Sequence, residues 1–294
     1  MVPTMLWIEI KADGETSRHD LPGTLFGPDG DRYELKYAVR QGGNGVVFSA
    51  TRYDESGSVT ATCAVKVLKE MELSRVDRFN NEVRILKELK HSSIAEYFAD
   101  GILSLGKWQV PWVAMELGGE NLRRHVDTKG PIERGSLVPV VAQMADALDL
   151  VHAKQLIHRD IKPENFVWEE GRPDRVLMID FGIAKRAGED VSGRPLDNFT
   201  KHLEFVGPQF FSSPELIAYA RDKKVQVDGR SDLFQLGKVV WFLATGAISA
   251  GVPSRSKCPF GGALCELIVA TLSDDPRDRP QTASEFRERL EALK

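Results

Sequence analysis

The hydrophobic pattern of this chain changes near the apolar run Trp112 to Leu117, and no other feature constrains the fold as strongly. Before this run, the apolar residues form short segments that are typical of β-strands. The clearest of these segments are Leu6 to Ile10, Tyr33 to Val39, Val46 to Thr51 and Ala61 to Leu68. After it, four segments have helical spacing, and these are Ser136 to His152, Ser231 to Ala244, Ala263 to Leu272 and Ala283 to Leu293. Because a strand-rich part followed by a helix-rich part is typical of α+β proteins, we expect an α+β fold with two lobes.

Length and composition exclude several classes of protein. The 294 residues are 42% hydrophobic and 28% charged, which is ordinary for a globular protein with a large core. A net charge of −4 disfavours a dedicated nucleic-acid binder. Cys63, Cys258 and Cys265 are too few for a disulfide framework, which indicates a reducing compartment. The stretch Val239 to Ile248 is about half the length of a membrane span, and the N-terminus lacks a signal-peptide pattern. We therefore expect a cytoplasmic location and no membrane contact within this chain.

One lysine and one glutamate lie in unusually apolar surroundings. Lys66 lies within a strand whose neighbours on both faces are apolar. A helix is expected over Ser74 to Leu89, and its spacing puts Glu82 on the same face as Phe79 and Leu86. Because a buried charge is costly without a partner, we expect an ion pair between Lys66 and Glu82. The alternative is a lysine that reaches solvent and a solvated glutamate.

Three short motifs follow in order in the second half of the chain. His158 to Asn165 reads HRDIKPEN, Asp180 to Gly182 reads DFG, and Ser213 to Glu215 reads SPE. The alternative to a functional site is a surface loop with charged residues. Three motifs that follow the buried Lys66 in the expected order disfavour this alternative. The whole set resembles the eukaryotic-type protein kinases, in particular the serine/threonine branch and its bacterial members.

The resemblance covers Tyr33 to the C-terminus and implies a bilobal protein-kinase fold. The implied kinase domain spans residues 32–294. It consists of a β-rich N-lobe with one helix (32–115), a hinge (116–119) and a mainly helical C-lobe (120–294). Residues 1–31 are expected to be an extension made of a hairpin, turning at Asp13 and Gly14, and a Gly- and Pro-rich linker over 21–31. The hairpin either lacks chemistry or makes a regulatory or dimer contact.

The resemblance also implies an activity and the residues that perform it. A serine/threonine protein kinase transfers the γ-phosphate of ATP, with Mg²⁺ or alternatively Mn²⁺ as the metal. Asp160 matches the catalytic base and Lys162 the lysine that steadies the γ-phosphate. Asn165 and Asp180 match the metal ligands, which supply the hard oxygens that Mg²⁺ prefers. Lys66 matches the lysine that binds the α- and β-phosphates, and Glu82 matches its glutamate partner.

A glycine-rich turn and the hinge complete the implied nucleotide site. The turn occupies Val39 to Val47, and its glycines would let backbone amides approach phosphates. Alone, a glycine-rich hairpin is most often only a turn without a binding role. The residues implied to contact the nucleotide are Val39, Gly42, Gly45, Val47, Ala64, Lys66, Met115, Glu116, Gly118 and Val167. Arg40 departs from the family pattern, since it stands where the first glycine is expected.

The segment between Asp180 and Glu215 also departs from the pattern. Glu204 lies three residues before Gly207, where many kinases carry a phosphorylated threonine. We expect its charge to pair with Arg159 and with Lys185, which would prime the enzyme without phosphorylation. Thr200, Ser192 and Ser212 remain candidate phosphosites. Pro208 replaces the usual threonine of serine/threonine kinases, whereas Lys162 favours that branch.

Structural roles are implied for three further residues, and alternatives to an active kinase remain. Asp232 would hold the backbone of the HRD loop, and Glu215 and Arg279 would form the family's buried ion pair. The alternatives are a weakly active pseudokinase or scaffold that binds nucleotide, and a small-molecule kinase of the same fold. Expected partners are protein substrates with Ser or Thr acceptors, including the enzyme itself, and no nucleic acid. The sequence does not predict an oligomeric state.

Overall fold

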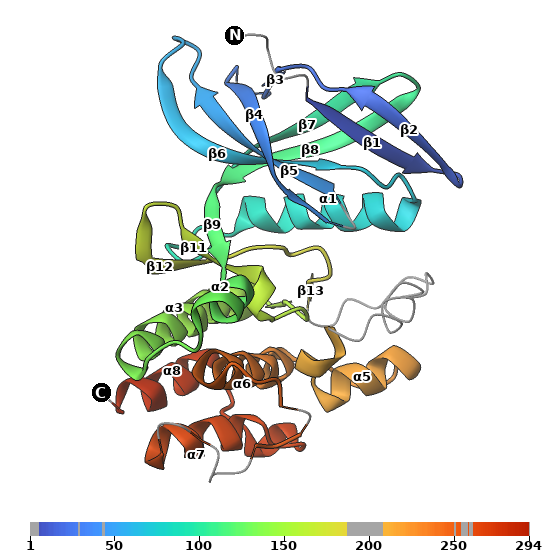
Figure 1. The fold of residues 1–294 in the computed structure, drawn as a ribbon. Coiled ribbons are helices and arrows are strands. Elements are labelled where there is room, and N and C mark those ends of the chain that lie inside the picture. Colours follow the sequence, from blue (N-terminus) through green and yellow to red (C-terminus); the bar gives the residue numbers. More distant parts are fainter. Residues whose placement is uncertain are drawn as a thin grey trace. The chain divides into compact units, whose positions relative to one another are not determined.

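The computed structural model describes residues 6–28, 30–42, 45–186, 208–249, 251–253, 258 and 261–293. The chain forms two compact units, shown in Figure 1. Residues 1–90 and 95–118 form the first unit, and residues 91–94 and 119–294 form the second. In the described residues the first unit is rich in strands and carries the helix α1, whereas the second unit is mainly helical. The predicted α+β class, with a β-rich part followed by a helical part, is therefore confirmed.

A six-stranded antiparallel sheet forms the centre of the first unit. Its strand order is β3-β4-β5-β6-β8-β7. The strands are β3 (Thr24–Phe26), β4 (Arg32–Gln41), β5 (Gly45–Tyr53), β6 (Val59–Leu68), β7 (Tyr97–Leu105) and β8 (Trp108–Glu116). The prediction of a linker over 21–31 is wrong at β3, because Thr24–Phe26 pairs with Arg32–Glu34 as an edge strand. Flanking glycines and prolines hide this short strand in the sequence.

The N-terminal hairpin forms as predicted. Strand β1 (Trp7–Ala12) pairs with β2 (Glu15–Asp20) around Asp13 and Gly14. Both turn residues have positive φ, 53° and 80°, as a type I′ turn requires. Ile8 and Ile10 are 1% exposed and join the apolar core of the sheet. The hairpin is thus an integral layer of the first unit.

Helix α1 (Leu73–Glu88) forms because its apolar residues recur on one face. Phe79, Glu82, Val83, Ile85 and Leu86 are buried. The predicted placement of Glu82 on the apolar face is confirmed.

The second unit is built around α6, which is buried on all sides from Ser231 to Ala244. Its helices are α2 (Leu122–Lys129), α3 (Arg134–Ala153), α5 (Pro214–Arg221), α6 (Gly229–Thr245), α7 (Gly262–Thr271) and α8 (Ala283–Glu291). Two small sheets have the orders β12-β11-β9 and β10-β13. Their strands are β9 (Gly118–Asn121), β10 (Leu156–Ile157), β11 (Phe166–Glu169), β12 (Arg172–Met178) and β13 (Lys185–Arg186). Short 3₁₀ turns lie at Pro163–Asn165, Pro208–Phe211 and Pro276–Asp278.

The helices and the cysteines of the described residues have two further properties. Within the described ranges, no helix has both the length and the apolar character of a membrane span. No disulfide joins cysteines in this part of the chain, and burial raises the pKa of the Cys63 thiol to about 12.

Candidate functional site

Lys66 and Glu82 meet inside the first unit. The Nζ of Lys66 donates hydrogen bonds to both carboxylate oxygens of Glu82, at 2.7 and 2.6 Å. The side chains are only 13% and 4% exposed. The Nζ also lies 5.9 Å from the centre of the Phe79 ring. Strand β6 and helix α1 therefore position a buried cation whose charge is balanced, as the sequence predicts.

Several predicted nucleotide residues share the sheet face that carries Lys66. Val47 is paired with Lys66 across β5 and β6, and Ala64 is paired with Met115 across β6 and β8. Since cross-strand partners and residues two apart lie on one face, these four side chains point to the same side. Beyond them, the backbone N–H of Glu116 donates to the carbonyl of Glu96 at 2.8 Å.

The glycine-rich turn is described on both sides of Gly43 and Asn44, which lie outside the described residues. The N–H of Gly42 donates to the carbonyl of Gly45 at 3.0 Å. A Cβ on Gly45 would lie 2.6 Å from the backbone oxygen of Val67, so close packing against β6 already requires glycine there. Val39 and Arg40 are exposed, and Arg40 pairs with Val47 in the ladder. Glycine is thus required at position 45 for a structural reason that the sequence alone does not reveal.

In the second unit, Asp160 is the centre of a polar cluster. The Nζ of Lys162 donates to both carboxylate oxygens of Asp160, at 2.9 and 2.7 Å. The Nδ2 of Asn165 donates to the backbone carbonyl of Asp160 at 2.8 Å and to Oδ2 at 2.9 Å. The 3₁₀ turn Pro163–Asn165 brings Asn165 back toward Asp160. Three of the predicted residues are therefore brought together.

Electrostatics link Asp180 to this cluster. Burial alone would lower the pKa of Lys162, but the charge and hydrogen bonds of Asp160 and the charge of Asp180 raise it overall. Lys162 therefore remains a cation. Asp180 has a φ of 67° and its Oδ1 accepts the N–H of Gly182 at 3.3 Å. Val167, the remaining predicted nucleotide residue in this unit, is buried in β11.

The chemistry of the cluster fits a divalent metal. The amide nitrogen of Asn165 donates its hydrogen bonds to Asp160, so the Oδ1 oxygen of Asn165 is the atom suited to bind a metal. Asp180 adds a carboxylate whose charge acts on Lys162. Hard oxygens of this kind are the ligands that Mg²⁺ prefers.

Asp232 anchors the backbone that carries Asp160. Its carboxylate is fully buried and accepts the N–H groups of His158 and Arg159, each at 2.8 Å, and the Nε2 of His152 at 2.9 Å. Burial alone would raise the pKa of Asp232, but the hydrogen bond and charge of His152 lower it overall. The sequence predicts the role of Asp232, whereas it does not identify His152. It also misses Gln235, whose Oε1 accepts the N–H of Ile161 at 3.2 Å.

His158 packs against the DFG phenylalanine. The ring centres of His158 and Phe181 are 4.8 Å apart, and both side chains are fully buried. Burial lowers the pKa of His158, so the ring is held neutral. The HRD and DFG motifs are thus packed together through their two ring residues.

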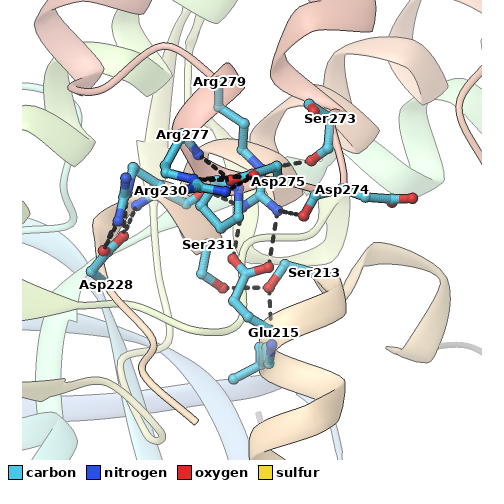
Figure 2. Close-up of polar contacts among 12 residues, drawn as sticks. Ser213, Glu215, Asp228, Arg230, Ser231, Ser273, Asp274, Asp275, Arg277 and Arg279 are labelled. Atoms are coloured by element: carbon cyan, nitrogen blue, oxygen red, sulfur yellow. Dashed lines mark hydrogen bonds and ion pairs between the residues drawn. The ribbon is translucent and has the colours of Figure 1, made fainter.

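Glu215 and Arg279 form the predicted buried ion pair, which Figure 2 shows. The guanidinium donates to the two carboxylate oxygens at 2.7 and 2.9 Å. It also donates to the carbonyls of Ser273 and Arg230 at 2.8 and 2.9 Å. This pair joins the start of α5 to the segment before α8.

Part of the predicted regulatory segment lies outside the described residues. Glu204, Thr200 and Ser192 belong to this part. The guanidinium of Arg159, the expected partner of Glu204, lies 5.0 Å from the centre of the Tyr219 ring. The Nζ of Lys223 lies 4.6 Å from the same ring.

Comparison with known proteins agrees with this geometry. A family model described as "Protein kinase domain" matches residues 33–257. Serine/threonine-protein kinase pkn3 of Myxococcus xanthus is 29% identical over 89% of this chain and 50% of its own length. Serine/threonine-protein kinase PkaA of Streptomyces coelicolor is 31% identical over 87% of this chain and 44% of its own. Serine/threonine-protein kinase PknB of Mycobacterium leprae is 29% identical over 87% and 42%. The chain spans about half or less of each of these relatives, and the predicted resemblance to the serine/threonine branch is confirmed.

Proposed function

We propose that this chain, which belongs to the protein kinase family, transfers the γ-phosphate of ATP to Ser or Thr hydroxyls of protein substrates. The observation that carries the proposal is the cluster of Asp160, Lys162 and Asn165, in which a carboxylate, a cation and an amide meet within 3 Å. The serine/threonine kinases among its relatives support the same activity.

Each member of the cluster has a distinct task in this proposal. Asp160 accepts the proton of the acceptor hydroxyl and orients it for attack on the γ-phosphorus. Lys162, held as a cation, balances charge on the γ-phosphate. Asn165 and Asp180 hold Mg²⁺ or Mn²⁺, and the metal supplies neutralisation of phosphate charge when bound.

Nucleotide binding is assigned to the lysine of β6, the glycine-rich turn and a set of mostly apolar residues. Lys66 binds the α- and β-phosphates, and its bond to Glu82 fixes the direction of the ammonium group. The glycine-rich residues Gly42 and Gly45, with Val39 and Val47, cover the phosphates. Adenine contacts are assigned to Ala64, Met115, Glu116, Gly118 and Val167. Arg40 adds a cation at the turn.

Lys162 supports the choice of Ser and Thr over Tyr. Lys162 is a cation two residues after the proposed base Asp160, and it is hydrogen-bonded to the Asp160 carboxylate. Pro208, where a threonine is usual, begins the 3₁₀ turn Pro208–Phe211. Autophosphorylation at Ser or Thr is part of the proposal. The kinase domain is assigned to residues 32–294, and the proposed compartment is the reducing cytoplasm.

Glu204 is proposed to prime the enzyme by supplying a permanent negative charge to Arg159. The support is its position three residues before Gly207. A Glu204→Ala variant is expected to lose activity and Glu204→Asp to keep part of it. Full activity of Glu204→Ala would exclude the priming role without touching the assignment of Asp160.

Mass spectrometry after incubation with Mg²⁺-ATP tests the activity, the acceptor residue type and autophosphorylation together. Asp160→Asn and Lys66→Met are expected to abolish transfer while circular dichroism stays unchanged. Asp127→Asn is a matched control, because Asp127 lies in an exposed ion pair with Arg123. Retained turnover in Asp160→Asn would refute the assignment. Nucleotide binding without any transfer by the wild type would instead favour a scaffold.

A further inference from the structure

The hairpin β1–β2 is hydrogen-bonded to the segment that joins Lys66 to Glu82. Strand β6 carries Lys66 and ends at Leu68, and helix α1 carries Glu82 and begins at Leu73. Between them, the carbonyl of Lys69 accepts the N–H of Lys11 at 2.8 Å, and the N–H of Met71 donates to the carbonyl of Lys11 at 2.9 Å. These two bonds form a parallel bridge between Lys11 and Glu70. We call residues 69–72 the β6–α1 linker.

The apolar face of the hairpin covers the side of the sheet that is opposite Lys66. Ile8 and Ile10 belong to one core cluster with Val65 and Val67, which alternate with Lys66 along β6. Met71 of the linker packs against the same cluster. The sheet therefore has α1 on the face of Lys66 and the hairpin on the other, and the linker contacts the hairpin as it passes between them.

The first turn of α1 depends on this linker for its position. Glu72, the residue before α1, makes no capping hydrogen bond with its side chain. Instead, Glu70 of the linker forms an ion pair with Arg75 in the first turn, at 3.3 Å. A linker fixed by the hairpin thus fixes the start of the helix that carries Glu82.

We propose that the N-terminal hairpin is a positioning element that holds α1 where Glu82 pairs with Lys66. Through the backbone bridge at Lys11, the hairpin thereby helps to present Lys66 from the other face of the sheet. The catalytic meaning of the pair rests on the proposed function, whereas the positioning itself does not.

A Lys11→Pro variant removes the N–H that bonds to Lys69 and leaves the hairpin ladder intact. The two backbone groups of Lys11 face the linker, so those of Ile10 and Ala12 face β2. Glu9→Pro is the matched control, because Glu9 lies on the same edge and no bond joins it to the linker among the described residues. Lys11→Ala is the second control, because it keeps the backbone bond and removes the side chain.

The first readout is the rate at which a water-soluble acetylating reagent modifies Lys66, measured by peptide mass spectrometry without nucleotide. Glu82→Gln supplies the rate for Lys66 without the Glu82 carboxylate. We expect Lys11→Pro to raise the rate about five-fold, the ratio that corresponds to one net hydrogen bond. Glu9→Pro and Lys11→Ala should match the wild type. Insertion of one glycine between Glu70 and Met71 breaks the same bridge from the other side and should act like Lys11→Pro.

The second readout is ATP-dependent phosphorylation, in which Lys11→Pro should lower kcat/KM by a similar factor. Wild-type labelling of Lys66 in a folded Lys11→Pro or glycine-insertion variant would overturn the proposal. An equal rise in Glu9→Pro would overturn it too, since general damage to β1 would then be the cause. If the wild type proves inactive, the labelling readout still tests the positioning, so failure of the proposed function is distinguishable.

Discussion

The carboxylate of Asp232 accepts the backbone N–H of Arg159 at 2.8 Å, while Arg159 has a φ of 67°. Non-glycine residues rarely adopt this left-handed conformation, and it persists only where the surroundings hold it. Because Asp160 follows directly, the bond to Asp232 sets the direction in which the chain enters the Asp160 cluster. A buried carboxylate on α6 thus supports a candidate site to which it contributes no reacting atom.

An Asp232→Asn variant should lose both stability and activity. The amide has one acceptor oxygen in place of two, so one of the N–H groups of His158 and Arg159 loses its acceptor. We expect the free energy of unfolding to fall by about 2–3 kcal/mol, as for a buried donor left unsatisfied. Urea unfolding measures the change in stability. The fall in kcat should be larger than the increase in the unfolded fraction accounts for. Asp228→Asn, at the N-cap of the same helix, should change stability by less than about 0.5 kcal/mol, because asparagine caps equally well.

Arg279→Lys should show how much the fork-shaped contact with Glu215 stabilises the second unit. Arg279 is fully buried, and its planar fork bonds both carboxylate oxygens of Glu215 as well as the carbonyls of Ser273 and Arg230. The three N–H groups of one ammonium cannot reproduce this whole set. Since Glu215 would be left with incomplete pairing, we expect a loss of about 3 kcal/mol in unfolding free energy. Arg277→Lys is the control, because the exposed pair of Arg277 and Asp275 contributes little. Equal effects of the two changes in thermal or urea unfolding would contradict this prediction.

The chain should become less stable as the pH is lowered, because His158 is buried. Burial lowers the pKa of this ring below its usual value of about 6.5, so the folded state binds fewer protons than the unfolded state. The stabilising effect is complete above the unfolded pKa and is lost as pH falls toward the folded pKa. Below pH 6.5 the slope should reach up to about 1.4 kcal/mol per pH unit. His158→Phe keeps a ring against Phe181 and should flatten the slope of urea-unfolding free energy between pH 6.5 and 5.5; equal slopes would contradict the prediction.

Local patterns predict much of this molecule. The ion pair of Lys66 and Glu82 follows from two charges on apolar faces, and the structure forms it. The Asp13–Gly14 turn follows from its residue types, and both residues adopt positive φ. The short strand Thr24–Phe26 is missed because glycines and prolines around it suggest a linker, whereas its pairing with β4 decides the structure.

Contacts between distant segments explain what the sequence does not show. His152 reaches Asp232 across 80 positions, and no periodicity within either helix indicates this bond. The bridge from Lys11 to Glu70 uses backbone groups alone, so no side-chain pattern marks it. Gly45 belongs to a glycine-rich motif, but the need for glycine arises from the Val67 carbonyl on the next strand. Such features depend on packing, which a linear pattern does not contain.

Gly45 and Gly42 should therefore respond differently to the same substitution. In Gly45→Ala the new Cβ would lie 2.6 Å from the Val67 oxygen, so the backbone must shift, and we expect a loss of about 1–3 kcal/mol in unfolding free energy. In Gly42→Ala the nearest atom is 4.0 Å away, so stability should be almost unchanged. If Gly42 covers phosphates as proposed, its alanine variant should instead raise the KM for ATP. Thermal unfolding and ATP kinetics of both variants separate the two roles, and a stability loss in Gly42→Ala equal to that in Gly45→Ala would contradict the distinction.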